Sequence, residues 1–167
     1  LFRSNFQRNL NIGEVEIEDR VIYHKTEYRE RRNHYSFFSV NSPINGYDTS
    51  RDIFLGNGNG NAFPAAVVEN KCRNSVASGW YPIASHQIDI SLAPGEEKTF
   101  VFILGYCENP VDQKFIAPGV ICKDMAYKLQ KKYATTESVD KAFAQLNEYW
   151  TNLLEKYEVN SGNEQVN

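Results

Sequence analysis

The hydrophobic pattern of the chain changes once, near Asn109-Pro110, and this change constrains the fold more than any other feature. Before it, short alternating or β-branched runs are separated by turn clusters, a pattern typical of antiparallel sandwiches. After it, apolar residues recur at three- and four-residue steps, as in amphipathic helices. We therefore expect a mainly β fold with C-terminal helices.

Five stretches carry the clearest β-type pattern: residues 13–18, 21–25, 35–40, 87–92 and 98–105. The first two are separated only by Asp19-Arg20 and are predicted to form a hairpin, although a type I′ turn prefers glycine. In the first strand, Val15 and Ile17 are expected on a buried face and the three glutamates beside them on a solvated face. Residues 98–105 are expected to be buried on both faces. Residues 65–69 are a further strand candidate.

Two helices are expected from Val120 onward. Thr135-Thr136 offers an N-cap for the second helix, with Glu137 in its first turn. The apolar stripe of this helix consists of Val139, Phe143, Leu146, Trp150, Leu153 and Tyr157. A stripe of this width needs a partner, either the sandwich or a structure outside the chain.

Composition excludes several function classes. The 167 residues suffice for one domain with a core, and the net charge is −3. This charge, and Glu27 and Glu30 in and beside the arginine cluster of residues 29–32, argue against nucleic-acid binding. No apolar run reaches membrane-spanning length, and we expect neither a membrane span nor a signal peptide. Three cysteines without close spacing predict reduced thiols in a cytoplasmic protein and no metal site. The sequence starts at Leu1 rather than at a methionine and stops without a closing element, so we expect it to be an internal piece of a longer protein.

Three segments are candidates for binding. Residues 26–34 concentrate charges between two aromatic strands, either as a solvated hairpin edge or as a polar surface for a sugar, a phosphate or a subunit. Residues 56–61 form a glycine- and asparagine-rich loop that lacks the lysine of a P-loop, so a surface loop is favoured. Trp80 and Tyr81 could stack on a sugar ring, but packing in a sandwich core is the favoured interpretation. No catalytic arrangement can be argued from these residues.

Several motifs resemble the cellobiose phosphorylase family of inverting glycoside phosphorylases, formerly glycosyltransferase family thirty-six. They are residues 6–10, 13–16, 23–35, 77–83, 85–86, 92–96, 104–106, 108–110, 149–150 and 163–164. The resemblance extends over essentially the whole chain. It implies that residues 1–112 are the second half of an N-terminal antiparallel β super-sandwich. It also implies that residues 113–167 are a two-helix linker to an α/α-barrel catalytic domain outside this chain.

The family resemblance implies a reversible reaction in which cellobiose and phosphate give α-glucose 1-phosphate and glucose. One aspartate of the barrel protonates the glycosidic oxygen while phosphate attacks from the opposite face. No residue of this chain is therefore expected to be catalytic, and the segment is not expected to be active alone. No cofactor or metal is implied, only inorganic phosphate as co-substrate. A homodimer is implied, with neither nucleic acid nor membrane as a partner.

Two residues match a binding position of the family. Arg8 corresponds to the arginine of a Gln-Arg-Asn segment that reaches the acceptor subsite of the neighbouring subunit, where its guanidinium would hydrogen-bond sugar hydroxyls. Gln7 is the second candidate, and an ordinary strand-end arginine is the alternative for Arg8. The function of the whole chain also has alternatives to a cellobiose phosphorylase. They are a non-catalytic carbohydrate-binding or structural module, and a phosphorylase of cellodextrin or laminaribiose. Alone, it is expected to leave strand edges and a helix stripe uncovered.

Overall fold

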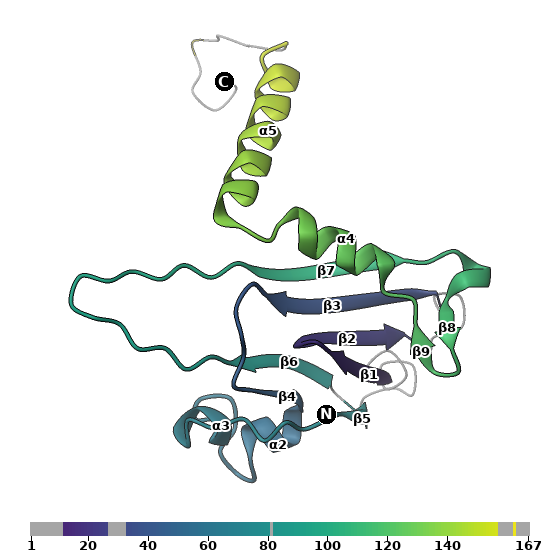
Figure 1. Ribbon diagram of the computed structural model, residues 1–167, viewed down its shortest axis with the longest axis vertical. Helices are drawn as coiled ribbons and strands as arrows, with labels where there is room; N and C mark the ends of the chain where they lie inside the picture. The colour runs from purple at the N-terminus through teal and green to yellow at the C-terminus, as the bar shows by residue number, and fades with distance from the viewer. Residues whose placement is uncertain (1–11, 27–32, 81, 157–161, 163–167) are drawn as a thin grey trace.

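The computed structural model describes residues 12–26, 33–80, 82–156 and 162. Five strands form the larger sheet: β1 (Ile12–Glu18), β2 (Val21–Thr26), β3 (His34–Val40), β5 (Ser78–Trp80) and β7 (Phe102–Glu108). Their order is β5-β1-β2-β3-β7, and every neighbouring pair is antiparallel (Figure 1). The expected mainly β fold with C-terminal helices is confirmed.

The hairpin of β1 and β2 is confirmed, with Glu18 paired to Val21. Asp19 and Arg20 alone connect the strands, and both have positive φ, 47° and 74°. Positive φ at both central positions is the requirement of a type I′ turn, whose twist matches that of the strands. The chain therefore makes this turn without the preferred glycine.

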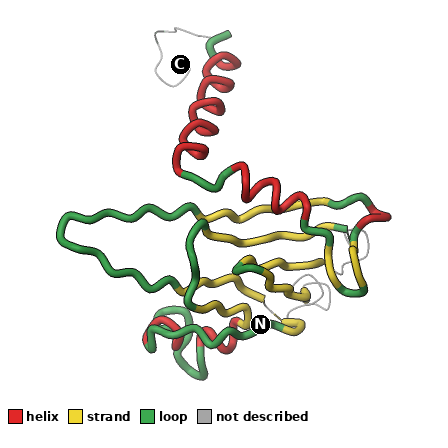
Figure 2. Tube along the Cα trace, viewed as in Figure 1, coloured by secondary structure: helices red, strands yellow, loops and turns green. Residues whose placement is uncertain are grey.

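A smaller layer of two antiparallel strands, β4 (Gly46–Ser50) and β6 (Pro82–Gln87), lies against one face of the larger sheet. The rings of Phe38 and His86 pack across the layers with centroids 4.8 Å apart. His24 Nε2 hydrogen-bonds the Ile83 carbonyl across the same gap at 3.1 Å. Two short helices, α2 (Arg51–Leu55) and α3 (Ala65–Val68), lie beside this layer (Figure 2).

The other face of the larger sheet carries the core. It is covered by β9 (Val120–Ile121) and α4 (Asp124–Lys132), which follow the 3₁₀ turn Val111–Gln113 and β8 (Phe115–Ala117). The buried cluster consists of Val21, Tyr23, Tyr35, Phe37, Cys107, Ile121 and Ala126. Gly105 lies against the Phe37 ring, where a Cβ atom would overlap the aromatic carbons. This close approach explains a glycine inside a strand.

The second helix, α5 (Thr136–Leu154), projects away from the sheets (Figure 1). Its predicted N-cap is confirmed, because Thr135 Oγ1 accepts from the Ser138 amide at 3.3 Å. No described residue of α5 is buried. Its apolar stripe therefore does not pack on the described part of the sandwich.

Three predictions about single segments are wrong. Residues 65–68 form the short helix α3 rather than a strand, with Glu69 as its C-cap, and its first two residues are alanines, which are the best helix formers. The strand predicted at residues 87–92 does not form, because β6 ends at Gln87 and residues 88–92 lie outside any strand. The strand predicted at residues 98–105 begins only at Phe102, and it is not buried on both faces, because nothing in the described chain covers its outer side.

Candidate functional site

Strand pairing brings several of the sequence candidates to one end of the larger sheet, which we call the rim. The rim consists of Ile12, Thr26, His34, Trp80 and Glu108. Ile12 pairs with Trp80, and the next residue of β1 pairs with Thr26. His34 pairs with Glu108. The segment before β1 and the charged segment between β2 and β3 therefore both join the sheet at this end.

The candidate side chains themselves are only partly described. Gln7 and Arg8, four to five residues before β1, lie outside the described residues, as do residues 27–32 and Tyr81. Trp80 is placed at the rim through its backbone pairing alone. The loop of residues 56–61 lies elsewhere, between α2 and α3, and does not belong to the rim.

A buried lysine, Lys25, lies next to the rim. The side chain of Lys25 is only 5% exposed, and its ammonium group has three acceptors. They are Glu14 Oε2 at 3.0 Å, Glu16 Oε1 at 2.9 Å and the Gly119 carbonyl at 2.8 Å. A lysine has three N–H donors, so its hydrogen-bonding capacity is matched. The contact with Gly119 joins the hairpin of β1 and β2 to the turn between β8 and β9.

A second buried lysine continues this network into the helical region. Lys123, whose side chain is 4% exposed, pairs with Glu16 Oε2 at 2.9 Å and with Glu18. Its ammonium group also lies 5.1 Å from the centroid of the Tyr23 ring. Tyr127 of α4 donates its hydroxyl to Glu18 Oε1 at 3.0 Å. We call the five charged residues Glu14, Glu16, Glu18, Lys25 and Lys123 the ion ladder.

Four groups of the ion ladder, Glu16, Glu18, Lys25 and Lys123, have pKa values shifted toward their charged forms. Burial alone would raise the pKa of Glu16, but hydrogen bonds from Lys25, Lys123 and the Ile121 amide lower it below 4.5. The hydrogen bond from Lys123 is the main cause that lowers the pKa of Glu18. Burial would lower the pKa of both lysines, but their carboxylate partners raise it above 10.5. All these groups are therefore charged at neutral pH.

Sequence reasoning missed this network. The glutamates of β1 were expected on a solvated face, yet Glu16 is largely buried and faces the segment that leads into α4. The bonds to Ile121 and Lys123 join residues 105 positions apart, so no local pattern indicates them. The one available signal was a lysine, Lys25, inside a strand of otherwise apolar and aromatic residues.

A polar cluster holds the other side of the rim. His34 contacts the Tyr106 hydroxyl through Nδ1, and its Nε2 lies 3.5 Å from Glu108. The Asn33 side-chain amide donates to the backbone carbonyl of Asn109 at 2.7 Å. In return, the backbone amide of Asn109 donates to the backbone carbonyl of Asn33 at 2.9 Å. These bonds fix the point at which the chain enters β3 after residues 27–32.

The described side chains form a positioning frame rather than a reaction centre. The carboxylates of the ion ladder are paired with the two buried lysines, and Glu16, whose side chain is only 16% exposed, lies between both of them. The described residues contain no group of three or more His, Cys, Asp or Glu side chains that could hold a metal ion. Cys72, Cys107 and Cys122 are free thiols. In the part of the chain that is described, no helix has the length and apolar character needed to cross a membrane.

One pocket of about 320 Å³ lies between α3 and β6, away from the rim. Some of its polar groups hydrogen-bond to neighbouring residues. The Gln87 side chain accepts from the Cys72 amide at 2.8 Å and donates to the Asn70 carbonyl at 3.2 Å. Ser85 donates to the Asp48 carbonyl at 3.1 Å.

The comparison with known proteins identifies the family. Residues 3–136 match the family described as glycosyl hydrolase 94, supersandwich domain, so the chain belongs to that family. It is 31% identical over 118 residues to an N,N'-diacetylchitobiose phosphorylase of Vibrio proteolyticus, which covers 71% of this chain. It is 29% identical over 128 residues, or 77% of the chain, to the protein of the same name from Vibrio furnissii.

A third relative has another substrate in its name. A 3-O-beta-D-glucopyranosyl-beta-D-glucuronide phosphorylase of Paenibacillus borealis is 26% identical over 125 residues, which is 75% of this chain. The matched regions make up only 13–14% of the length of these three relatives. The predicted relationship to glycoside phosphorylases is confirmed, whereas the specific link to cellobiose stays a prediction.

Proposed function

We propose that this chain is the supersandwich segment of a glycoside phosphorylase that converts cellobiose and phosphate into α-glucose 1-phosphate and glucose. The match of residues 3–136 to the glycosyl hydrolase 94 supersandwich domain carries the proposal. The three relatives are all named as phosphorylases, which supports the reaction class. The motifs that resemble cellobiose phosphorylases support the choice of disaccharide.

N,N'-diacetylchitobiose is the second candidate substrate, because two relatives carry it in their names. The two candidates differ at the 2-position of both sugar rings, where cellobiose has hydroxyls and diacetylchitobiose has acetamido groups. The polypeptide that contains this chain, supplied with phosphate and either disaccharide, distinguishes them. Release of glucose 1-phosphate supports cellobiose, and release of N-acetylglucosamine 1-phosphate supports the second candidate.

In this proposal the chain binds and positions but does not catalyse. Residues 1–112 contribute a sandwich domain and a dimer contact, and residues 113–167 lead to the barrel that holds the catalytic aspartate. The rim is where the segment that carries Arg8 joins the sheet, four residues before Ile12. The ion ladder supports that function because it attaches the same hairpin rigidly to the segment that enters α4.

Arg8→Ala in the complete enzyme tests this role. Loss of a charged hydrogen bond to a sugar hydroxyl costs about 1.5–3 kcal/mol, so the KM for the acceptor sugar should rise about ten- to a hundredfold. The KM for the sugar 1-phosphate should stay nearly constant, since that substrate occupies the other subsite. Arg73→Ala is the matched control, because Arg73 pairs with Glu69 beside α3, away from the rim. If Arg8→Ala leaves both constants unchanged, Arg8 does not belong to the acceptor site.

A further inference from the structure

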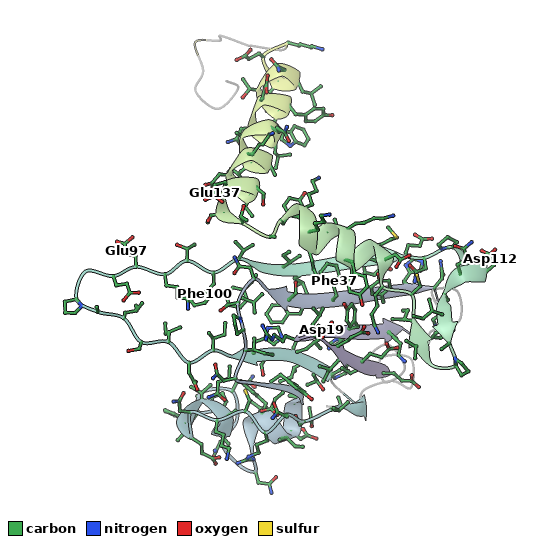
Figure 3. The ribbon with its side chains drawn as sticks, in the orientation of Figure 1. Asp19, Phe37, Glu97, Phe100, Asp112 and Glu137 are labelled. Atoms are coloured by element: carbon green, nitrogen blue, oxygen red, sulfur yellow. The ribbon has the colours of Figure 1, made fainter. Side chains whose placement is uncertain are left out.

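The pocket between α3 and β6 lies on the smaller layer, far from the rim. Figure 3 shows the side chains of α2 and α3 gathered below the sheets, whereas the labelled Asp112, four residues after Glu108 of the rim, lies at the opposite side of the view. The volume of about 320 Å³ is at the lower end of the range of about 300–1,000 Å³ for small-molecule sites. A ligand of this pocket is therefore a small molecule rather than a long chain.

Hydrogen bonds hold the walls of the pocket in place. The Gln87 side chain of β6 bridges the segment after α3, because it accepts from the Cys72 amide and donates to the Asn70 carbonyl. The Lys71 amide donates back to the Ala66 carbonyl of α3 at 2.9 Å. The pocket is thus formed without a ligand, so binding does not have to order this segment.

Several polar groups of the lining are unused. Within the described chain, the side-chain amide of Asn70 and the ammonium group of Lys71 make no hydrogen bond or ion pair. Both ring nitrogens of His86 are buried and also lack a hydrogen-bond partner among the described residues, although the Arg20 backbone lies near the ring. Buried polar atoms without a partner are uncommon, and water or a ligand commonly satisfies them.

The rest of the lining is largely apolar. The apolar side chains come from α2, α3 and the residue after β6, and they are Phe54, Ala66, Val67 and Ile88. An aromatic ring beside aliphatic groups suits the C–H face of a pyranose, because the negative face of the ring attracts polarised C–H bonds. The lining therefore combines an apolar part with hydrogen-bonding groups, as a sugar ring does.

The polar groups favour a neutral ligand over a phosphate. Burial lowers the pKa of His86 below 6.5, so its imidazole is neutral at neutral pH and carries one donor and one acceptor. The Asn70 amide also donates and accepts. A phosphate needs donors on all sides, whereas the carboxylate of Asp89 lies 3.0 Å from the Gln87 side-chain amide. Hydroxyl groups, which both donate and accept, match this lining better.

We propose that this pocket binds a single neutral pyranose ring, with the C–H face of the sugar toward Phe54 and its hydroxyls toward the unused polar groups. This inference rests on the proposed function, since a glycoside phosphorylase meets such sugars as substrates and products. The site binds without reacting. None of the described lining residues is a carboxylic acid, and burial raises the pKa of the Cys72 thiol, which keeps it protonated.

Alkylation of Cys72 measures the occupancy of the pocket. The complete polypeptide is treated with iodoacetamide without phosphate, and peptide mass spectrometry gives the rate at each cysteine. Glucose at about 100 mM, a hundredfold above a Kd of about 1 mM, should slow alkylation of Cys72 at least about fivefold. N-acetylglucosamine is the second probe. Cys122, also a partly buried free thiol but beside β9, is the internal control, and its rate should change less than about twofold.

Two substitutions in the lining connect this protection with the pocket. His86→Phe keeps an aromatic ring but removes both nitrogens, and Lys71→Met keeps the length of the side chain but removes its donors. Each should raise the glucose concentration for half-protection about three- to tenfold. Lys71 is exposed, so its variant should fold even if His86→Phe does not. Lys128→Met on the exposed side of α4 is the matched control and should leave the protection unchanged.

Several outcomes would overturn the proposal. They are equal alkylation of Cys72 with and without either sugar, and full protection by glucose in both lining variants. Protection by inorganic phosphate alone would indicate an anion site instead. Protection by sorbitol, a hexitol without a ring, would indicate a general effect of solutes. The measurement needs no turnover, so a failure of phosphorolysis would refute the proposed function without changing the protection of Cys72.

Discussion

Lys123→Met breaks the ion ladder at the point where it holds α4. The Lys123 ammonium lies 2.9 Å from Glu16 Oε2, an attraction of about 6 kcal/mol at an effective dielectric constant of about 20. Desolvation of the two ions offsets much of this attraction, and removal of one partner of a buried pair costs about 3–5 kcal/mol. Glu18 is 45% exposed and Lys25 still neutralises Glu16, so we expect a smaller cost of about 2–3 kcal/mol.

Amide exchange of α4 in the 167-residue chain measures this cost. A loss of about 2–3 kcal/mol corresponds to exchange about thirty- to a hundredfold faster, provided that α4 opens locally. Lys128→Met is the matched control, because Lys128 lies on the exposed side of the same helix. Its exchange should stay within about twofold of the wild type. Unchanged exchange in Lys123→Met, or an equal rise in both variants, would refute the structural role of the ladder.

The remaining predictions concern acid, packing and capping. Glu16 and Glu18 have lowered pKa values, so the stabilisation that they provide is present above about pH 4.5 and disappears as the pH falls below it. Amide exchange of α4, corrected for its intrinsic rate, should therefore accelerate in acid. An acid-insensitive α4 would contradict this. Gly105→Ala places a Cβ atom in the Phe37 ring and should cost about 1–3 kcal/mol in urea unfolding, whereas an unchanged midpoint would show that the ring moves freely. Thr135→Ala removes the cap of α5 and should reduce its helicity by circular dichroism, at about 1 kcal/mol, whereas Thr135→Ser should restore it.

The parts of the fold that local sequence determines could be predicted. Strands β1, β2 and β3 have alternating or β-branched and aromatic sequences, and only two residues separate β1 from β2. Thr135 is a cap at the start of an apolar stripe. Helix α3 was missed because Val67-Val68 favours a strand in isolation, whereas the two alanines before it favour a helix turn. The burial of β7 on both faces was predicted wrongly for a different reason. An apolar sequence shows that a strand can be buried, but a residue is buried only where another part of the protein covers it.

The sequence predicted which segments contribute to the candidate site, but it did not predict the side-chain contacts within the site. Turn positions and strand register bring the charged segment and the start of β1 to the same rim. The ion ladder depends on pairs such as Glu16 with Lys123, which only the fold brings together. Arg8 remains a prediction from resemblance, since it lies outside the described residues.

Phosphate-dependent cleavage of a β-linked disaccharide tests the central claim most directly. The complete polypeptide is incubated with cellobiose and inorganic phosphate, and the sugar phosphate and free sugar are quantified. The proposal predicts equal amounts of α-glucose 1-phosphate and glucose, with no cleavage when phosphate is omitted. Cleavage to two glucose molecules without phosphate, or no cleavage of either cellobiose or N,N'-diacetylchitobiose, would contradict it.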